Sequence, residues 1–260
     1  MDLGLQGKFA LVTGGTHGIG LATARALAGE GCHVAICSRT LEKIETAKED
    51  LKTMGVEVLG IQADVLSPEA IPNVMKVIVQ SWGKLHILVN NVGGGGRWGS
   101  ASIEDTPEQV WWDVYSKNAM AAVKFTTLAL PLMRKEKWGR VVTVSSIYGR
   151  EGGGRPWFNM AKSAEISLMK SLSIIPEIVR DGVTFNSIAP GGIFIEDTGF
   201  DLEKKKDPQR FNQMLNLGYP LGRMGTPDEV ASVIAFICSE KGSLINGSCI
   251  VVDGGQSRSF

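Results

Sequence analysis

Long apolar runs, paired cysteines and an excess of charge of either sign are all missing from this chain of 260 residues. Its apolar runs, such as residues 233–238, fall far short of the roughly 18 residues that indicate a membrane-spanning helix. We also expect no secretory signal, because no basic stretch near the N-terminus precedes an apolar run. Lys plus Arg and Asp plus Glu each total 27, and this balance argues against nucleic acid or an anionic membrane as the main partner.

Patterns typical of metal sites and disulfides are missing as well. The four cysteines include no Cys-x-x-Cys motif, so we expect free thiols in a reducing cytoplasm. His17, His33 and His86 have no metal-ligand spacing, which argues against a catalytic zinc ion or any other metal centre. The run Lys204–Lys206 lies between acidic residues and is expected to be the solvated face of a helix.

Short apolar runs alternate with longer amphipathic segments along the whole chain, which is 43% hydrophobic. The expected strands are residues 8–13, 33–38, 56–63, 86–90, 140–145, 183–189 and 249–252. The expected helices are residues 19–28, 42–53, a segment from about Pro68, 107–134, 156–180 with a break near Pro176, and 227–238. Most strands lack polar alternation, as is typical of parallel strands covered on both faces. The sequence predicts an α/β fold: a single doubly wound, Rossmann-like parallel sheet with helices on both faces, in one domain of residues 1–260.

A glycine-rich turn joins the first expected strand to the first expected helix. Its glycines are Gly14, Gly15, Gly18 and Gly20. Glycine permits a tight turn and the close approach of a pyrophosphate, which the unpaired N–H groups of a helix N-terminus bind well. Such a turn is also common as ordinary loop chemistry, but its place between a strand and a helix favours dinucleotide binding.

The spacing Gly-x-x-x-Gly-x-Gly resembles that of the short-chain dehydrogenase/reductase family, and in particular its NADP-dependent 3-oxoacyl-[acyl-carrier-protein] reductase-like members. Further motifs of that family follow in chain order, and the resemblance covers essentially the whole chain. They are Asp64-Val65, Asn90-Asn91-Val92-Gly93, Asn118, Ser145-Ser146, Lys162, Pro190-Gly191 and Asp253-Gly254-Gly255.

The resemblance implies where a dinucleotide contacts this chain. It places the turn at the phosphates and ribose, the residues after the third strand at the adenine, those after the fourth strand along the ribose, and those after the sixth strand near the nicotinamide. In that order the residues are Gly14, Gly15, Thr16, His17, Gly18, Ile19 and Gly20; Asp64 and Val65; Asn91 and Gly93; and Pro190, Gly191 and Ile193.

The end of the second strand predicts which dinucleotide is bound. An NAD enzyme usually offers a carboxylate there to the adenosine 2′-hydroxyl, whereas this strand ends in Ser38 and Arg39 and the first acid afterwards is Glu42. The fixed fork of donors on Arg39 suits a 2′-phosphate. We therefore predict NADP(H) in preference to NAD, the alternative being that Arg39 is a plain surface charge.

The resemblance also implies a reaction centre made of a Tyr–Lys pair four residues apart, a serine and an asparagine. Lys162, Asn118 and Ser146 fill three of these roles, with Ser145 as an alternative serine, while Phe158 stands where the tyrosine is expected. A phenyl ring can neither give nor take a proton. Three explanations stay open: an engineered Tyr→Phe change, a natural variant that uses another donor, and a protein that binds NADP(H) without turnover. The other donors considered are a water on Lys162, Tyr148 and a group on the substrate.

Two glycine-rich loops, residues 93–99 and 152–157, are expected beside the substrate. Arg97 and Arg155 within them are candidates for holding an anionic substrate group, or are plain loop charges. Residues from about 194 to 217 correspond to a lid over the substrate in the resembling proteins. The same resemblance implies a homotetramer.

The predicted function is hydride transfer between NADP(H) and a small-molecule carbonyl or alcohol, with an atypical proton donor. The alternative is an NADP(H)-binding protein with little or no redox turnover, which would be a sensor, a partner subunit or a Tyr-to-Phe inactivated variant. A lyase or dehalogenase on the same scaffold is disfavoured, because resembling proteins of that kind fill the dinucleotide site, and Gly14, Gly18 and Gly20 are kept here.

Overall fold

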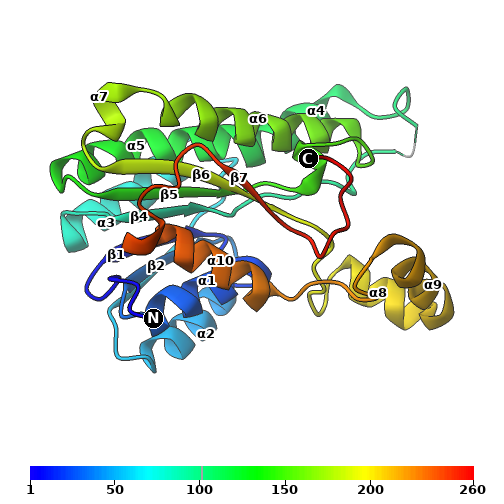
Figure 1. Ribbon diagram of the computed structural model, residues 1–260, viewed down its shortest axis with the longest axis horizontal. Helices are drawn as coiled ribbons and strands as arrows, with labels where there is room; N and C mark the ends of the chain where they lie inside the picture. The colour runs from blue at the N-terminus through cyan, green and yellow to red at the C-terminus, as the bar shows by residue number, and fades with distance from the viewer. Residues whose placement is uncertain (101) are drawn as a thin grey trace.

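A single parallel sheet runs through the protein, in the strand order β3-β2-β1-β4-β5-β6-β7 (Figure 1). The computed structural model describes residues 1–100 and 102–260. The strands are β1 (Phe9–Thr13), β2 (His33–Ser38), β3 (Val58–Gln62), β4 (Ile87–Asn90), β5 (Gly139–Val144), β6 (Val183–Pro190) and β7 (Cys249–Val252). Every neighbouring pair in the sheet is parallel. The doubly wound parallel sheet predicted from the sequence is therefore confirmed.

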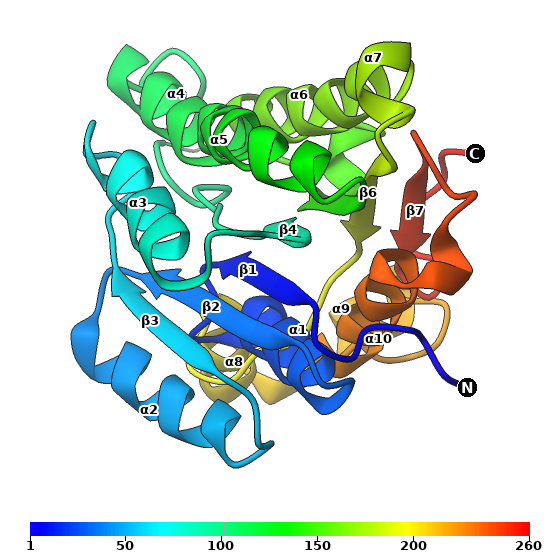
Figure 2. The same ribbon diagram turned by 90° about the vertical axis from the view of Figure 1, so that its left-hand side faces the viewer.

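Helices cover both faces of the sheet (Figure 2). One layer consists of α1 (Gly18–Gly29), α2 (Leu41–Lys52) and α10 (Pro227–Cys238), and the other of α3 (Ala70–Trp82), α4 (Glu108–Tyr115), α5 (Ala121–Lys135), α6 (Pro156–Ser173) and α7 (Pro176–Val179). Adjacent strand residues point to opposite layers: Leu11 packs in one hydrophobic core and Val12 in the other. Because both faces are buried, the strands carry apolar residues at successive positions.

Local sequence signals set several helix ends. Thr226 and Glu229 form a reciprocal capping box at the start of α10, and Pro227 occupies its first turn. Pro156 starts α6 in the same way. The helix expected from about Pro68 instead begins at Ala70, because the backbone N–H of Ser67 bonds to Asp64 O and the preceding residues form a turn.

The long helix expected over residues 107–134 is helical throughout most of its length but is not one regular helix. A π-helical segment, η1 (Ser116–Met120), lies between α4 and α5. A π-helical turn holds one more residue than the α-helical turn it replaces, and such segments are frequent at functional sites. Asn118 lies in the middle of η1 and is fully buried.

The direction of chain winding reverses between β1 and β4, which are neighbours in the sheet. From β1 the chain moves outward to β2 and β3, and from β4 it moves outward in the opposite direction. Open α/β sheets bind ligands at the carboxyl ends of the two strands that flank such a reversal. The glycine turn follows β1 and Asn91 follows β4, so both lie at this point.

Two helices, α8 (Gly199–Lys206) and α9 (Pro208–Gly218), lie outside the two layers, beyond the carboxyl end of β6 (Figure 1). They have a small core of their own, in which buried Phe211, Tyr219 and Met224 pack with Phe194 and Phe200. The lysines 204–206 are exposed along α8, as expected of a solvated helix face.

The short helices η2 (Ile147–Gly149) and η3 (Glu240–Gly242) complete the elements of the structure. Within residues 1–100 and 102–260, no helix is both long enough and apolar enough to cross a bilayer. The four cysteines are free thiols. Over the same described residues, no three His, Cys, Asp or Glu side chains gather as metal ligands would.

Candidate active site

The glycine turn after β1 is held in shape by close packing. Gly14 has a φ of +66°, in the left-handed region that favours glycine. A Cβ atom on Gly20 would overlap both the carbonyl oxygen of Gly14 and the side-chain amide of Asn91. The turn therefore folds back on the start of α1, whose free backbone N–H groups and positive dipole end suit a phosphate.

Asn91 ties the ends of β1 and β4 together. Its Nδ2 donates to the carbonyl oxygens of Thr13 at 2.8 Å and Gly14 at 3.2 Å. The hydroxyl of Thr13 accepts the backbone N–H groups of Asn91 and Val92, each at 2.9 Å. These bonds fix the floor of the crevice between the two strands.

A cavity of about 290 Å³ extends from this floor across the ends of β1, β2 and β3. It is lined by the residues that the sequence assigns to the phosphates, the 2′ position, the adenine and the ribose, namely Gly14, Thr16, His17, Ser38, Arg39, Asp64, Val65, Asn91 and Gly93. Thr16 Oγ1 donates to Ser38 Oγ at 3.0 Å, which joins the turn to the end of β2. The structure thus brings most of the predicted cofactor residues to one place.

Lys117 also lines the cavity and was not identified from the sequence. Partial burial lowers its pKa, and the positive charge of Arg39 lowers it further. Its Nζ lies 4.8 Å from the centroid of the Trp98 ring, a cation–π distance. With Arg39, this residue makes that end of the cavity positive, which fits a phosphorylated ligand.

The remaining residues predicted to bind cofactor do not line this cavity. Gly15 packs against Ile36 of β2, Gly18 against Ile195, and Ile19 against the core beneath α1. Pro190 ends β6, and Gly191 packs against Asp253 and Gln256. Ile193 is buried and pairs with Gly225 in a β-bridge. These positions shape the turn and the carboxyl edge of the sheet.

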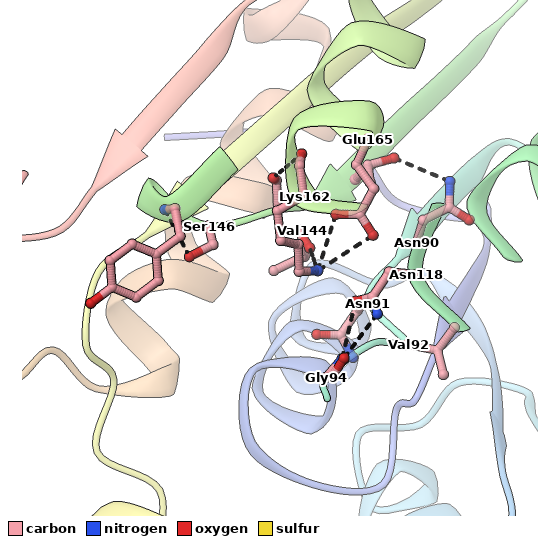
Figure 3. A network of polar contacts seen from close by, with 12 residues as sticks. Asn90, Asn91, Val92, Gly94, Asn118, Val144, Ser146, Lys162 and Glu165 are labelled. Atoms are coloured by element: carbon pink, nitrogen blue, oxygen red, sulfur yellow. Dashed lines mark hydrogen bonds and ion pairs between the residues drawn. The ribbon is translucent and has the colours of Figure 1, made fainter. Parts of the chain in front are cut away.

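Lys162 projects from α6 into the bottom of the crevice, where it is only 4% exposed. Its Nζ donates to the carbonyl oxygen of Val144 at 3.0 Å and to Glu165 Oε2 at 3.0 Å, as Figure 3 shows. Glu165 is 1% exposed, and this burial raises the pKa of its carboxyl to about 7, although the charge of Lys162 works in the opposite direction. The centre of the site is therefore a buried ion pair.

Asn118 lies beside this pair and is fixed by three hydrogen bonds. Its Nδ2 donates to the carbonyl oxygen of Gly94 at 2.9 Å, and its Oδ1 accepts from the backbone N–H of Gly94 at 3.1 Å (Figure 3). Nδ2 also donates to the carbonyl oxygen of Val114 at 2.7 Å. A Cβ atom on Gly93 would lie 3.2 Å from Lys162 Nζ. Gly93 therefore adjoins Lys162 and also lines the cavity, so the two parts of the site are continuous.

The two candidate serines differ in what they bond. The Ser145 hydroxyl is buried and donates to the carbonyl oxygen of Lys162 at 2.8 Å. Ser146 Oγ accepts the backbone N–H of Tyr148 at 3.2 Å, an arrangement that leaves its hydroxyl proton available. This difference favours Ser146 over Ser145 as a donor to a substrate oxygen.

Phe158 lies one helical turn before Lys162 on the same face of α6. Its ring packs with Val114, Trp157 and other residues of a small cluster, and faces Gly96 of the glycine-rich loop. The chemistry available at this position is therefore van der Waals contact and the attraction of a cation to the ring face.

The two arginines considered for substrate binding already have protein partners. Arg97 Nη1 pairs with Glu203 of α8 at 3.0 Å, and its guanidinium lies 5.1 Å from the centroid of the Phe200 ring. Arg155 donates to the carbonyl oxygen of Ser100. Arg97 thus connects the glycine-rich loop to the α8–α9 segment.

Sequence reasoning missed Lys117 and Glu165. Nothing in the spacing of Lys117 distinguishes it from a surface lysine before Asn118. Glu165, by contrast, lies three residues after Lys162 on a predicted helix, and side chains at that spacing meet on one face. That signal was available in the sequence.

Known proteins resemble this chain along nearly its full length. A family model described as enoyl-(acyl carrier protein) reductase matches residues 14–257. The chain is 35% identical over 260 residues to 3-oxoacyl-[acyl-carrier-protein] reductase FabG of Aquifex aeolicus (strain VF5), covering 98% of this chain and 100% of the relative. It is 35% identical over 254 residues to dehydrogenase/reductase SDR family member 4 of Bos taurus, covering 97% of this chain and 88% of the relative.

Solved structures show the same similarity. The L-sorbose reductase from Gluconobacter frateurii complexed with NADPH and L-sorbose superposes with a TM-score of 0.91 at 30% identity, over 100% of both chains. A Pseudomonas aeruginosa RhlG/NADP active-site complex gives a TM-score of 0.87 at 29% identity, over 98% of both chains. The fold, the ordered motifs and these relatives agree, and the chain belongs to the short-chain dehydrogenase/reductase family of oxidoreductases.

Proposed function

We propose that this protein transfers a hydride between NADP(H) and a small-molecule carbonyl or alcohol. The observation that carries the proposal is the continuity of the site. Gly93 both lines the cavity at the glycine turn and adjoins Lys162 Nζ, so one extended ligand can reach from Arg39 to the buried ion pair.

The residues present fit a phosphorylated adenine dinucleotide. The start of α1 offers N–H groups to a pyrophosphate, Asp64 and Val65 line the cavity where an adenine would lie, and Lys162 is placed for the nicotinamide ribose. Arg39 and Lys117 give the adenosine end the positive charge that a 2′-phosphate requires. These charges support NADP(H) over NAD(H).

When bound, the dinucleotide supplies or accepts the hydride, and the protein handles binding, orientation and the proton. Ser146 stabilises the substrate oxygen with its hydroxyl. Asn118 holds the loop at Gly94 beside Lys162. Residues 194–217, including α8 and most of α9, cover the substrate, and their apolar cluster around Phe211 forms the underside.

One observation favours a second function, namely binding of NADP(H) with little or no turnover. Phe158 stands where the family resemblance places a tyrosine, and it offers no proton. A sensor, a partner subunit or a Tyr-to-Phe inactivated variant would all have this arrangement. Within the first function, the candidate donors are a water on Lys162, Tyr148 and a group on the substrate.

Three further features belong to the same proposal. The free cysteines support a reducing, cytoplasmic setting. The family resemblance supports a homotetramer. The names of the relatives point to carbonyl and alcohol substrates, because they include reductases of L-sorbose and of 3-oxoacyl groups.

Calorimetry with NADPH and NADH, followed by a screen of NADPH oxidation over carbonyl compounds, tests the proposal. The screen uses the unchanged protein and Phe158→Tyr side by side. Binding with turnover in either protein supports the oxidoreductase, whereas binding with turnover in neither supports the second function. No saturable association with either nucleotide would overturn both.

A further inference from the structure

The ion pair between Lys162 and Glu165 lies at the reaction centre and belongs to a single helix. Both residues project from the same face of α6, since they are three positions apart. Glu165 Oε2 and Oε1 lie 3.0 Å and 3.4 Å from Lys162 Nζ. Figure 3 shows the carboxylate on one side of the ammonium and the Val144 carbonyl on another.

Burying this pair costs desolvation free energy. Both charges are withdrawn from water, and a buried ion pair is often no more stabilising than apolar residues of the same size. Two of the three ammonium N–H groups go to Val144 O and Glu165. The one that is left can meet either the nicotinamide ribose or the substrate oxygen, but not both at once. Phe158, one turn away, supplies no proton, whereas this pair is able to store one.

We propose that Lys162 and Glu165 together supply the proton for reduction, with Lys162 donating it to the substrate oxygen and Glu165 returning it to Lys162. This inference rests on the proposed function. Lys162 would be the catalytic residue, and Glu165, which acts through it, a positioning residue.

As hydride from NADPH adds to the carbonyl carbon, an N–H bond of the Lys162 ammonium breaks and an O–H bond forms on the substrate, which leaves a neutral amine. The protonated carboxyl of Glu165 then gives its proton to that amine, which restores the ammonium and leaves a carboxylate. Solvent reprotonates the carboxylate before the next cycle, so one hydride and one proton are consumed per turnover.

The surroundings of Glu165 suit this role. Lys162, on the same helix, is the charged group that acts on the Glu165 carboxyl. Beyond Lys162 lies Lys117 of η1, whose pKa is influenced by the charges of Arg39, Asp64 and Lys162. Burial raises the pKa of the Glu165 carboxyl to about 7, so near neutral pH it is present in both the protonated and the ionised form. A carboxyl with an ordinary pKa would be ionised almost completely and could not return a proton.

The first test needs neither cofactor nor substrate. Thermal unfolding of the free protein is measured from pH 5 to pH 8 for the unchanged chain and for Glu165→Gln. A carboxyl whose folded pKa lies above its unfolded value of about 4.5 adds stability at low pH, and that stability is lost as the pH rises to about 7. The melting temperature of the unchanged protein should therefore fall relative to the variant over this range. A constant difference would overturn the inference.

The second test follows turnover, using a carbonyl compound reduced in the screen. The unchanged protein should lose reductase rate about tenfold per pH unit above pH 7, because the proton-returning form of Glu165 disappears. Glu165→Gln keeps a hydrogen-bond partner for Lys162 but cannot carry the proton. It should complete a first turnover and then slow at least about tenfold in steady state. Equal first-turnover and steady-state rates would contradict the relay.

Phe158→Tyr provides the internal comparison. In Phe158→Tyr a phenol is present as the donor, so adding Glu165→Gln should lower the steady-state reductase rate by less than about threefold. An equal loss of rate in the unchanged protein and in Phe158→Tyr would show that Glu165 has a merely structural role. NADPH titration of every variant distinguishes failure of the proposed function from failure of the proton relay. Lost NADPH binding in the unchanged protein would refute the proposed function, whereas retained binding with no effect of Glu165→Gln refutes only the relay. If Glu165→Gln does not fold, the pH dependence of the reductase rate is compared between the unchanged protein and Phe158→Tyr. Identical pH profiles of the two proteins would refute the relay.

Discussion

The Nζ atom of Lys162 lies 5.6 Å from the centroid of the Phe158 ring. At this distance the ring face attracts the ammonium, by about 0.5–2 kcal/mol in known cases. The ring therefore keeps one structural function of an aromatic residue at this place, which is to hold the lysine, while it lacks the hydroxyl that would move a proton.

Restoring a hydroxyl at this position should raise activity. We expect Phe158→Tyr to increase the rate of carbonyl reduction by at least about tenfold, since a positioned general acid contributes about 10²–10⁴-fold. Steady-state NADPH oxidation measures the change. Phe158→Leu is the matched control, because it alters the packing without adding a donor and should give no gain. An unchanged rate in Phe158→Tyr, with NADPH still bound, would count against a family-like reaction centre.

Arg39 should control the choice between the two nicotinamide dinucleotides. Arg39→Glu is expected to weaken NADPH binding by about 10–100-fold, because a hydrogen bond to a charged group contributes about 1.5–3 kcal/mol, and to affect NADH much less. Calorimetric titration with NADPH and with NADH gives the ratio of the two affinities. Arg180→Glu, at an exposed position after α7, carries the same charge change and should alter neither affinity. Equal losses for NADPH and NADH in Arg39→Glu would refute the assignment.

Two glycines of α1 give a sharp contrast. A Cβ atom on Gly20 would overlap Gly14 O and the Asn91 amide, so Gly20→Ala must push apart the turn and the end of β4. We expect a loss of about 1–3 kcal/mol in the free energy of unfolding and at least tenfold weaker NADPH binding. Gly29→Ala, on the same helix with open space around it, should be neutral or stabilise by up to about 1 kcal/mol. Urea unfolding and NADPH titration of both variants measure these effects. Similar stability and NADPH affinity in Gly20→Ala and Gly29→Ala would contradict the prediction.

His86 should make the protein less stable in mild acid. Burial, followed by the charge of Lys8, lowers the pKa of His86 to about 4, and its Nδ1 accepts the backbone N–H of Phe9 at 3.1 Å. Between pH 6.5 and pH 4 the unfolded chain binds more protons at this residue than the folded protein, so stability falls as the pH drops. The full effect is at most about 3 kcal/mol.

Urea unfolding at pH 7 and pH 4.5 measures this contribution. His86→Asn keeps an acceptor near the position of Nδ1 but does not titrate, so its loss of stability on acidification should be smaller than that of the unchanged protein. His33→Asn is the control, because His33 also stacks on Phe9 and accepts a backbone N–H group. Equal losses of stability on acidification in the unchanged protein and in His86→Asn would show that His86 is not the source of the acid sensitivity.

The fold was predictable from the sequence because its signals are local and repeated. The strands β2 and β7 and the helix α10 begin and end at the residues expected, since apolar runs, prolines and caps mark them. The π-helical segment was not predictable, because Ser116–Met120 has ordinary helical composition.

The candidate site was predictable where backbone geometry needs a particular residue, as at Gly14 and Gly20. Roles that depend on which way a side chain turns were not. The ion pair of Arg97 with Glu203 joins residues more than a hundred positions apart, and no pattern in either segment indicates it. The functional roles of Lys162 and Phe158 remain predictions that the measurements described above test, and the role of Ser146 remains a prediction.

The π-helical segment also constrains the length of the chain. Each residue of an α-helix turns the next by about 100°, so deleting one residue from 116–120 would let α4 and α5 run as one regular helix but would rotate one of them by that angle against the other. Either Asn118 would leave Gly94, or Trp111 would leave the edge-to-face contact it makes with Trp157. At this turn a shortened chain would disrupt the site even if every remaining residue were kept.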